Sequence, residues 1–210
     1  SWEAAYFNIN EKKLLRLAKA GKEAGVELFV MDDGWFGERN DDTSSLGDWT
    51  PNEKKLPGGI REIADKIKAL GIDFGIWVEP EMVNVKSRLY EKHPEWVVDI
   101  PEKPHSEGRN QRILDLSNTE VQDYIIEQMS NIFSSADISY VKWDMNRIFS
   151  DYYSKNLPPE RQGEMAHRYV CGLYHCMREL TKRFPDILFE GCSAGGNRFD
   201  LGILCYFPQI

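Results

Sequence analysis

The sequence has few of the residue patterns that mark disulfide-rich, zinc-binding or strongly basic proteins. Its four cysteines form no CxxC pair and fit no zinc-ligand spacing, so neither a zinc site nor a disulfide framework is indicated. This absence favours a reducing compartment, and we expect a cytoplasmic protein. The net charge of −8 disfavours binding to nucleic acid or to an anionic membrane, although it is also typical of an ordinary solvated surface.

The sequence also lacks a signal-peptide pattern, an apolar run long enough to span a membrane, internal repeats and low-complexity stretches. It begins abruptly at Ser1-Trp2, which suggests a cut inside a larger protein, so the absence of a signal segment is not established. No glycine-rich loop follows the first expected strand, and this disfavours a dinucleotide-binding fold. The 210 residues are enough for one sizeable core.

Short apolar runs alternate with segments of helical periodicity along the chain. Strands are expected at 26–31, at 72–78, at 138–143 and from residue 187, and Tyr6-Phe7 is interpreted as the end of a further strand. Helices are expected from about residue 14 to 21 or 25, from 57 to 71, from a capping box at 117–120 to about 133, and from 158 to about 184. This alternation predicts parallel βα units. The segment 90–112 is irregular and long for a connection, as functional loops often are.

Charged and aromatic residues gather directly after each expected strand. The four groups are Asp32-Asp33-Gly34-Trp35, Trp77 with Glu79-Pro80-Glu81, the segment 142–147, and the segment 190–196. In parallel α/β barrels the active site forms at the carboxyl ends of the strands, so the four groups are predicted to share one site. Tryptophan faces beside carboxylate and lysine groups suit a sugar, which offers apolar C–H faces and a rim of hydroxyls.

Asp144 is the expected centre of this site. Because side chains alternate along a strand, Lys142 and Asp144 are predicted to lie on the same side. We expect the lysine charge to keep the Asp144 carboxylate ionised at neutral pH. An ionised aspartate at the mouth of the site is what a retaining glycosidase needs as its nucleophile. None of the four histidines is assigned to catalysis.

Each pattern also has an ordinary structural interpretation. Asp32-Asp33 fits a turn or a helix cap, Gly195-Gly196 fits a turn, and tryptophans are more often packed in a core. A magnesium-dependent lyase is a further alternative, since Mg²⁺ prefers oxygen ligands such as those of Asp32, Asp33, Glu79 and Glu81. The joint occurrence of these groups at every strand end favours the functional interpretation.

Longer motifs around these residues resemble the bacterial α-galactosidases of glycoside hydrolase family 36. The matching segments cover essentially the whole chain and include 1–4, 32–37, 43–49, 79–82, 107–111, 142–147, 159–164 and 189–193. The resemblance implies a (β/α)₈ TIM barrel, of which residues 1–210 would supply about the first five βα units. It implies retaining hydrolysis of terminal non-reducing α-D-galactosyl residues in melibiose- and raffinose-type sugars. It further implies no cofactor and a cytoplasmic parent protein that is a homo-oligomer, often a tetramer.

The resemblance also assigns roles to individual residues. Asp144 matches the family's nucleophile, and Asp32 and Asp33 match the pair that holds the galactose hydroxyls. The other expected substrate contacts are Trp2, Trp77, Arg109, Lys142, Asn146, Cys192 and Gly195. No metal ligand is expected.

The chain departs from the family pattern at several points. The family's β-rich N-terminal domain, last three barrel strands and C-terminal β-sandwich have no counterpart in residues 1–210. Residues 207–210 normally precede a Trp-Thr-Ser-Asp segment that holds the general acid/base, so we expect that residue beyond 210 and expect the 210-residue chain by itself to be inactive. Ala194 and Asn197 stand where the family more often has glycine, and we interpret both as tolerated.

Three alternatives to galactoside hydrolysis are kept open by the sequence. The same barrel could transfer galactose to an acceptor sugar, or could act on α-linked N-acetylgalactosamine. A non-catalytic sugar-binding remnant of the barrel is the third alternative, and it predicts binding without a covalent adduct.

Overall fold

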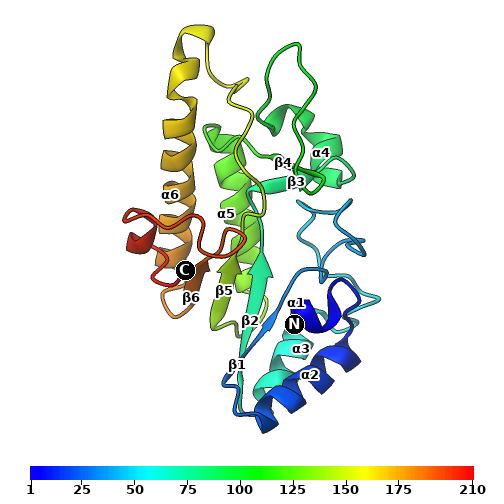
Figure 1. The fold of residues 1–210 in the computed structure, drawn as a ribbon. Coiled ribbons are helices and arrows are strands. Elements are labelled where there is room, and N and C mark those ends of the chain that lie inside the picture. Colours follow the sequence, from blue (N-terminus) through cyan, green and yellow to red (C-terminus); the bar gives the residue numbers. More distant parts are fainter.

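The computed structural model describes residues 1–210 as a four-stranded parallel sheet with helices packed along it (Figure 1). In sheet order the strands are β1 (Leu28–Met31), β2 (Asp73–Val78), β5 (Tyr140–Trp143) and β6 (Leu188–Gly191). Met31 pairs with Ile76, Val78 pairs with Trp143, and Trp143 pairs with Gly191. The carboxyl ends of all four strands therefore meet at one edge of the sheet, and the predicted parallel α/β organisation is confirmed.

Four helices pack along this sheet: α2 (Glu11–Glu23) precedes β1, and α3 (Gly59–Lys68), α5 (Thr119–Phe133) and α6 (Met165–Arg183) lie in the connections between strands. Figure 1 shows α5 and α6 along the β5–β6 side of the sheet, whereas α2 and α3 lie near β1. Each helix buries an apolar stripe at helical spacing. In α3 the stripe consists of Ile60, Ile63, Ala64 and Ile67, and full burial of an isoleucine contributes roughly 1.5–3 kcal/mol.

Side-chain caps fix where two of these helices begin. Asn10 precedes α2 and accepts a hydrogen bond from the Lys13 amide at 2.9 Å. Asn118 precedes α5 and accepts one from the Glu120 amide at 2.9 Å. The residue that caps α5 is thus Asn118, while the Ser117 hydroxyl donates to Asp115 at 2.6 Å. The 3₁₀ helix η2 (Pro159–Glu164) precedes α6, and η3 (Ile203–Cys205) follows β6.

The irregular segment after β2 contains a second, smaller sheet. Strands β3 (Met82–Asn84) and β4 (Gln111–Ile113) pair antiparallel, and between them lie α4 (Arg88–Lys92) and η1 (Pro94–Trp96). Three-residue strands are too short to give a periodic signal in a sequence. Figure 1 places this small sheet beyond the carboxyl end of β2, where it extends the strand-end surface.

The interpretation of Tyr6-Phe7 as the end of a strand is wrong. Both residues lie in a turn after the short helix α1 (Trp2–Ala5), and Tyr6 has a positive φ of 45° that no regular strand allows. Phe7 packs edge-on against Trp2, with ring centroids 5.0 Å apart. Two adjacent aromatic residues occur in packed turns as well as in strands. The parallel sheet therefore has four strands and lacks the further strand that was expected before residue 7.

Most tryptophans belong to the core, as their ordinary interpretation predicts. Trp35, Trp49, Trp77, Trp96 and Trp143 are buried, and only Trp2 is partly exposed. All four cysteines are free thiols. No helix of the chain has the length and apolar character needed to cross a membrane.

Candidate active site

One pocket of about 340 Å³ opens at the carboxyl ends of the four parallel strands. Its wall brings together every residue that the sequence singled out as catalytic or substrate-binding: Trp2, Asp32, Asp33, Trp77, Arg109, Lys142, Asp144, Asn146, Cys192 and Gly195. Glu3 and Ala194, which were not expected to contact substrate, complete the lining. A larger hollow of about 700 Å³ lies beside Trp49 and Tyr124, but it does not include any of these residues.

Asp144 is held by hydrogen-bond donors on both carboxylate oxygens. Oδ2 accepts from Trp77 Nε1 at 3.0 Å and from Asn146 Nδ2 at 2.6 Å. Oδ1 accepts from the backbone N–H of Met145 at 2.8 Å and from that of Ala194 at 3.3 Å. The carboxylate is only 5% exposed, so these donors replace most of the water that would otherwise solvate its charge.

These donors keep Asp144 ionised. Burial by itself would raise its pKa, but hydrogen bonds from Trp77, Cys192 and Asn146 and from the Met145 amide hold the pKa below the ordinary value of 3.8. Burial raises the pKa of the Cys192 thiol to about 11, so the thiol keeps the proton that it donates to Asp144. At neutral pH the centre of the pocket is therefore an anion with fixed donors around it.

Lys142 does not pair with Asp144 in the way that strand alternation suggested. Its ammonium group lies 3.2 Å from Asp32 Oδ2, and this carboxylate raises the lysine pKa against the opposing effect of burial. Lys142 and Asp144 do line the same pocket, as expected, and the charge of Asp144 also raises the lysine pKa, but hydrogen bonds are the main contributions that keep Asp144 ionised. Asp32 attracts the lysine because it projects into the same pocket from the end of β1, which β2 separates from β5 in the sheet.

The acidic pair after β1 has two different surroundings. Asp32 faces Lys142, and its amide donates to Ser1 Oγ at 3.1 Å. Asp33 is 3% exposed and accepts three contacts from Arg39, with Nε at 2.9 and 3.2 Å and Nη2 at 2.8 Å. Such a bidentate guanidinium pair fixes the direction of the Asp33 carboxylate.

A glycine lets the turn that holds this pair pack tightly. Gly34 has φ +105°, and an added Cβ would lie 3.1 Å from Phe7 Cα. Both the dihedral angle and the close approach require glycine here. The turn therefore packs directly against the segment that follows α1, and α1 carries Trp2 to the pocket wall.

The glutamates after β2 lie behind the pocket. Glu79 is fully buried, accepts a hydrogen bond from the Asn146 amide and another from Gln111 Nε2 at 3.0 Å. Burial raises its pKa to about 8, and the neighbouring Asp144 charge adds to the effect. Glu81 is also fully buried and accepts from Trp143 Nε1 at 2.8 Å, from Tyr169 Oη at 2.6 Å and from Arg198 Nη1 at 2.6 Å.

These contacts bear on the magnesium alternative. Asp32, Asp33 and Glu81 each face a cationic side chain, and Glu79 points to amide donors. No group of three or more His, Cys, Asp or Glu side chains lies close enough together to hold a metal ion. The four carboxylates are thus not arranged as a magnesium site.

Sequence patterns missed two residues that support the pocket from behind. Arg39 and Asn84 are both completely buried, and neither belongs to a strand-end group. A single arginine within the polar stretch after β1 was the only available signal. Asn84 gave none, because its role depends on β3, a strand too short to be recognised.

The parallel sheet and its strand-end pocket, centred on an ionised carboxylate, have the form that carbohydrate-processing α/β enzymes use. The chain belongs to the Melibiase family, whose model matches residues 1–210. Over 209 residues it is 57% identical to alpha-galactosidase AgaA of Geobacillus stearothermophilus, covering 100% of this chain and 29% of that protein. It is 50% identical over 210 residues to alpha-galactosidase Mel36A of Lactobacillus acidophilus, and this match also covers 100% of this chain and 29% of that protein.

Solved structures are similar as well. An AgaA variant crystallised in complex with raffinose matches with a TM-score of 0.97 and 57% identity, over 100% of this chain and 29% of that one. The chain thus spans less than a third of the length of the relatives that it matches.

Proposed function

We propose that residues 1–210 form the galactosyl-binding part of a retaining α-galactosidase active site. The observation that carries this proposal is the buried, ionised Asp144 inside a pocket with Trp2, Asp32 and Lys142. Relatives at 57% and 50% identity are named alpha-galactosidases, and one similar structure was crystallised with raffinose. The substrate is then a sugar with a terminal, non-reducing α-D-galactosyl residue, and the chemistry expected of these residues needs no cofactor.

In this mechanism Asp144 acts as the nucleophile. One of its carboxylate oxygens attacks the anomeric carbon, and the bond from that carbon to the leaving oxygen breaks as a general acid protonates the leaving group. The resulting covalent galactosyl ester is then attacked by water, whose proton passes to the same acid/base, and Asp144 is released as an anion. In retaining enzymes the two carboxyl groups lie roughly 5–5.5 Å apart.

The second carboxyl group is expected to come from outside residues 1–210. Within the pocket, Asp32 and Asp33 are already paired with Lys142 and Arg39. Burial raises the pKa of Asp33 against the opposing effect of Arg39, but both oxygens of Asp33 are bound by Arg39, so this carboxyl is not free to protonate a leaving group. Both pairs suit acceptors for sugar hydroxyls. We therefore infer that an aspartate of a following Trp-Thr-Ser-Asp segment supplies the acid and base.

The whole protein is proposed to be a complete (β/α)₈ barrel. Strands β1 and β6 each have one neighbouring strand, and their outer edges carry only the bond from the Ser1 amino group to the Val30 carbonyl and the bridge between Glu190 and Gln209. Further parallel strands would pair with these edges and close the barrel. A β-rich domain before the barrel, a β-sandwich after it, assembly into a tetramer and a cytoplasmic location complete the proposal. They rest on the family resemblance.

Covalent trapping tests the proposed reaction. In a polypeptide of the relatives' length, an activated fluoro-galactoside should add the mass of one fluorogalactosyl group to the peptide that contains Asp144, with loss of the leaving group. The Asp144→Asn variant should neither turn over melibiose nor form the adduct, and azide should partly restore cleavage of an activated galactoside. Asp186→Asn, a change at an exposed aspartate, is the control and should behave like the unmodified protein. Galactose binding without any adduct would instead identify a non-catalytic sugar-binding protein.

A further inference from the structure

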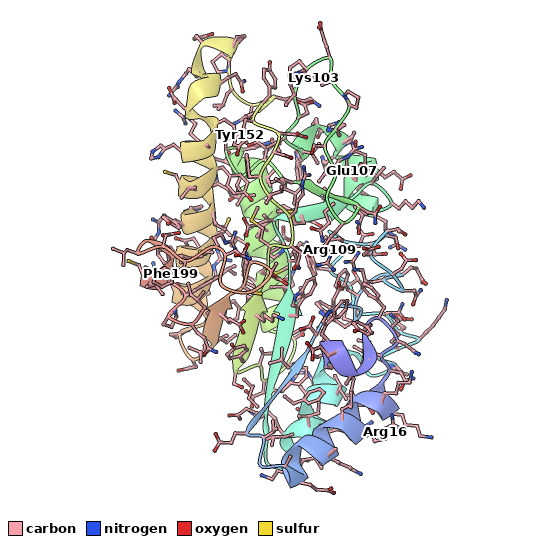
Figure 2. All side chains as sticks on the ribbon, viewed as in Figure 1. Arg16, Lys103, Glu107, Arg109, Tyr152 and Phe199 are labelled. Atoms are coloured by element: carbon pink, nitrogen blue, oxygen red, sulfur yellow. The ribbon has the colours of Figure 1, made fainter.

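Two residues of the pocket wall reach it from distant parts of the sequence. Asp33 follows β1, whereas Arg109 comes from the long loop before β4. Figure 2 places Arg109 near the middle of the molecule, and Lys103 at the outer tip of the same loop. Between Asp33 and Arg109 lie the two completely buried side chains of Arg39 and Asn84.

Arg39 forms the first half of this connection. Its Nε and Nη2 bind Asp33, and its Nη1 donates to Asn84 Oδ1 at 2.9 Å and to the Ser44 carbonyl at 3.0 Å. The aromatic rings of Phe7 and Phe36 lie 5.3 and 5.8 Å from the guanidinium carbon. With no exposed surface, the guanidinium group has no water to replace a lost partner, so its partners determine its position.

Asn84 forms the second half. Its Oδ1 also accepts from the Leu46 amide at 2.9 Å, and its Nδ2 donates to the Asn110 carbonyl at 2.7 Å and to the Asp42 carbonyl at 3.1 Å. The side-chain amide therefore uses both of its N–H groups and both acceptor positions of its oxygen. Arg39 is linked to the backbone of the Arg109 turn through this one side chain.

The turn at Arg109 needs an external support. Arg109 and Asn110 have φ values of 53° and 58°, so two successive residues other than glycine adopt the left-handed conformation. This conformation costs roughly 1–2 kcal/mol for each such residue, somewhat less for asparagine. Both residues are exposed, so no buried side chain of their own holds the turn. The hydrogen bond from Asn84 to the Asn110 carbonyl connects it to the interior, beside the bond from the amide of the buried Gln111 to the Gly108 carbonyl at 3.0 Å.

We propose that Arg39 and Asn84 are positioning residues, which fix the distance between Asp33 and Arg109 and so set the affinity for the galactoside. This inference rests on the proposed function. Neither residue touches Asp144, whose partners are Trp77, Asn146, Cys192 and two backbone amides. Loss of the connection should therefore weaken substrate binding in the ground state and the transition state alike, which raises KM and leaves kcat nearly unchanged.

The variant Asn84→Asp tests the link to Arg109 in a polypeptide of the relatives' length. Its carboxylate can still accept from Arg39 and from Leu46, but it cannot donate to the Asn110 carbonyl. We expect KM for nitrophenyl α-galactoside to rise on the order of tenfold, with kcat within about threefold of the unmodified value. Asn40→Asp is the matched control, because Asn40 is exposed and lies one residue from Arg39, and its KM should not change.

A second variant tests the same turn at an exposed position, where a substitution should not prevent folding. Asn110→Ala changes an exposed residue, removes the bond from Asn110 Nδ2 to Asp42 Oδ1 (3.1 Å) and makes the left-handed turn less favourable. Its KM should also rise. In an Arg109→Ala background, neither Asn84→Asp nor Asn110→Ala should raise KM further, since the side chain that they position is gone.

The outcomes separate the two levels of the proposal. An unmodified protein without galactoside turnover overturns both the proposed function and this inference. Normal turnover by the unmodified protein, together with an unchanged KM for Asn110→Ala, overturns the positioning role alone. An additional rise in KM on top of Arg109→Ala would also overturn it, because the effect would then not pass through Arg109.

Discussion

Asp144 keeps its charge through donors that are specific to its place in the fold. Trp77 reaches it from β2, Asn146 and Met145 belong to its own turn, and Ala194 follows β6. Because each donor favours the ionised form, removal of any one of them should raise the pKa of the carboxylate.

Trp77→Phe removes one donor and keeps most of the ring. The pKa of Asp144 should rise, so the acidic limb of the kcat/KM pH profile should move to higher pH by about one to two units, as expected for one hydrogen bond to a charged group. Trp96→Phe changes a buried tryptophan outside the pocket and should leave the limb in place. An acidic limb that does not respond to the loss of the Trp77 N–H would show that this donor does not set the charge.

Glu79 should link the stability of the fold to pH. Its pKa is about 8 in the folded protein and ordinarily 4.5, so the folded state holds a proton that the unfolded chain releases. The resulting stabilisation is complete below about pH 4.5 and is lost as pH rises through about 8. Glu79→Gln is neutral at every pH. As pH rises from about 5 to about 8, the Tm of this variant should therefore increase relative to that of the unmodified protein.

Differential scanning fluorimetry at several pH values measures this difference. Glu23→Gln, at an exposed position, should give a Tm difference that does not change with pH. If the Tm difference between Glu79→Gln and the unmodified protein stayed constant across the range, Glu79 would be ionised in the fold.

Individual residues were predictable from the sequence where their chemistry was local. Asp144 and the pair Asp32-Asp33 could be recognised because each directly follows an apolar strand. Arg39 and Asn84 could not, because they are 45 positions apart and meet only in the folded chain. For the same reason the partner of Lys142, 110 positions away at Asp32, was not foreseen.

In the loop after β6, the backbone of Ala194 has a conformation that is unfavourable for alanine, and a substitution can relieve this strain. Ala194 has φ +48°, which costs a residue with a side chain roughly 1–2 kcal/mol, whereas glycine adopts it readily. Ala194→Gly should therefore raise the free energy of unfolding by up to about 1 kcal/mol, once the greater chain entropy of glycine is deducted. Turnover should persist, because the amide that donates to Asp144 remains.

Asn197→Gly provides the contrast within the same loop. The Asn197 side chain donates to the Ser193 and Ala194 carbonyls at 3.0 and 3.2 Å, and its φ is not among the positive ones. Glycine would lose both bonds and add chain entropy, so this variant should be less stable than the unmodified protein. Chemical denaturation of the two variants measures the difference, and opposite signs are expected.

The four long helices and the four strands of the parallel sheet could be predicted from apolar periodicity and turn residues, whereas the short helices α1 and α4 could not. The small β3–β4 sheet and the turn at Tyr6-Phe7 could not, because local sequence is ambiguous at that length. The order β1-β2-β5-β6 follows from the usual adjacency of successive βα units.

The open sheet has consequences for the chain as a whole. Apart from single contacts with Ser1 and Gln209, strands β1 and β6 leave unpaired edges, and an exposed edge can pair with another molecule. Residues 1–210 produced alone should therefore self-associate in light scattering. They should also cleave nitrophenyl α-galactoside at least about 10²-fold more slowly than a polypeptide of the relatives' length, because the acid/base that we expect from the Trp-Thr-Ser-Asp segment is not among them. Comparable turnover by the two polypeptides would contradict the proposed source of the acid.

The hydrogen bonds around Asp144 have a further consequence for the conditions in which such a protein works. Dissolved ions weaken attraction between exposed charges, but they do little to buried contacts made at hydrogen-bond distance. A galactoside is uncharged, so its approach is also indifferent to ionic strength. The charge of Asp144 should therefore be insensitive to high salt, whereas exposed ion pairs such as that of Arg161 with Glu164 should weaken there.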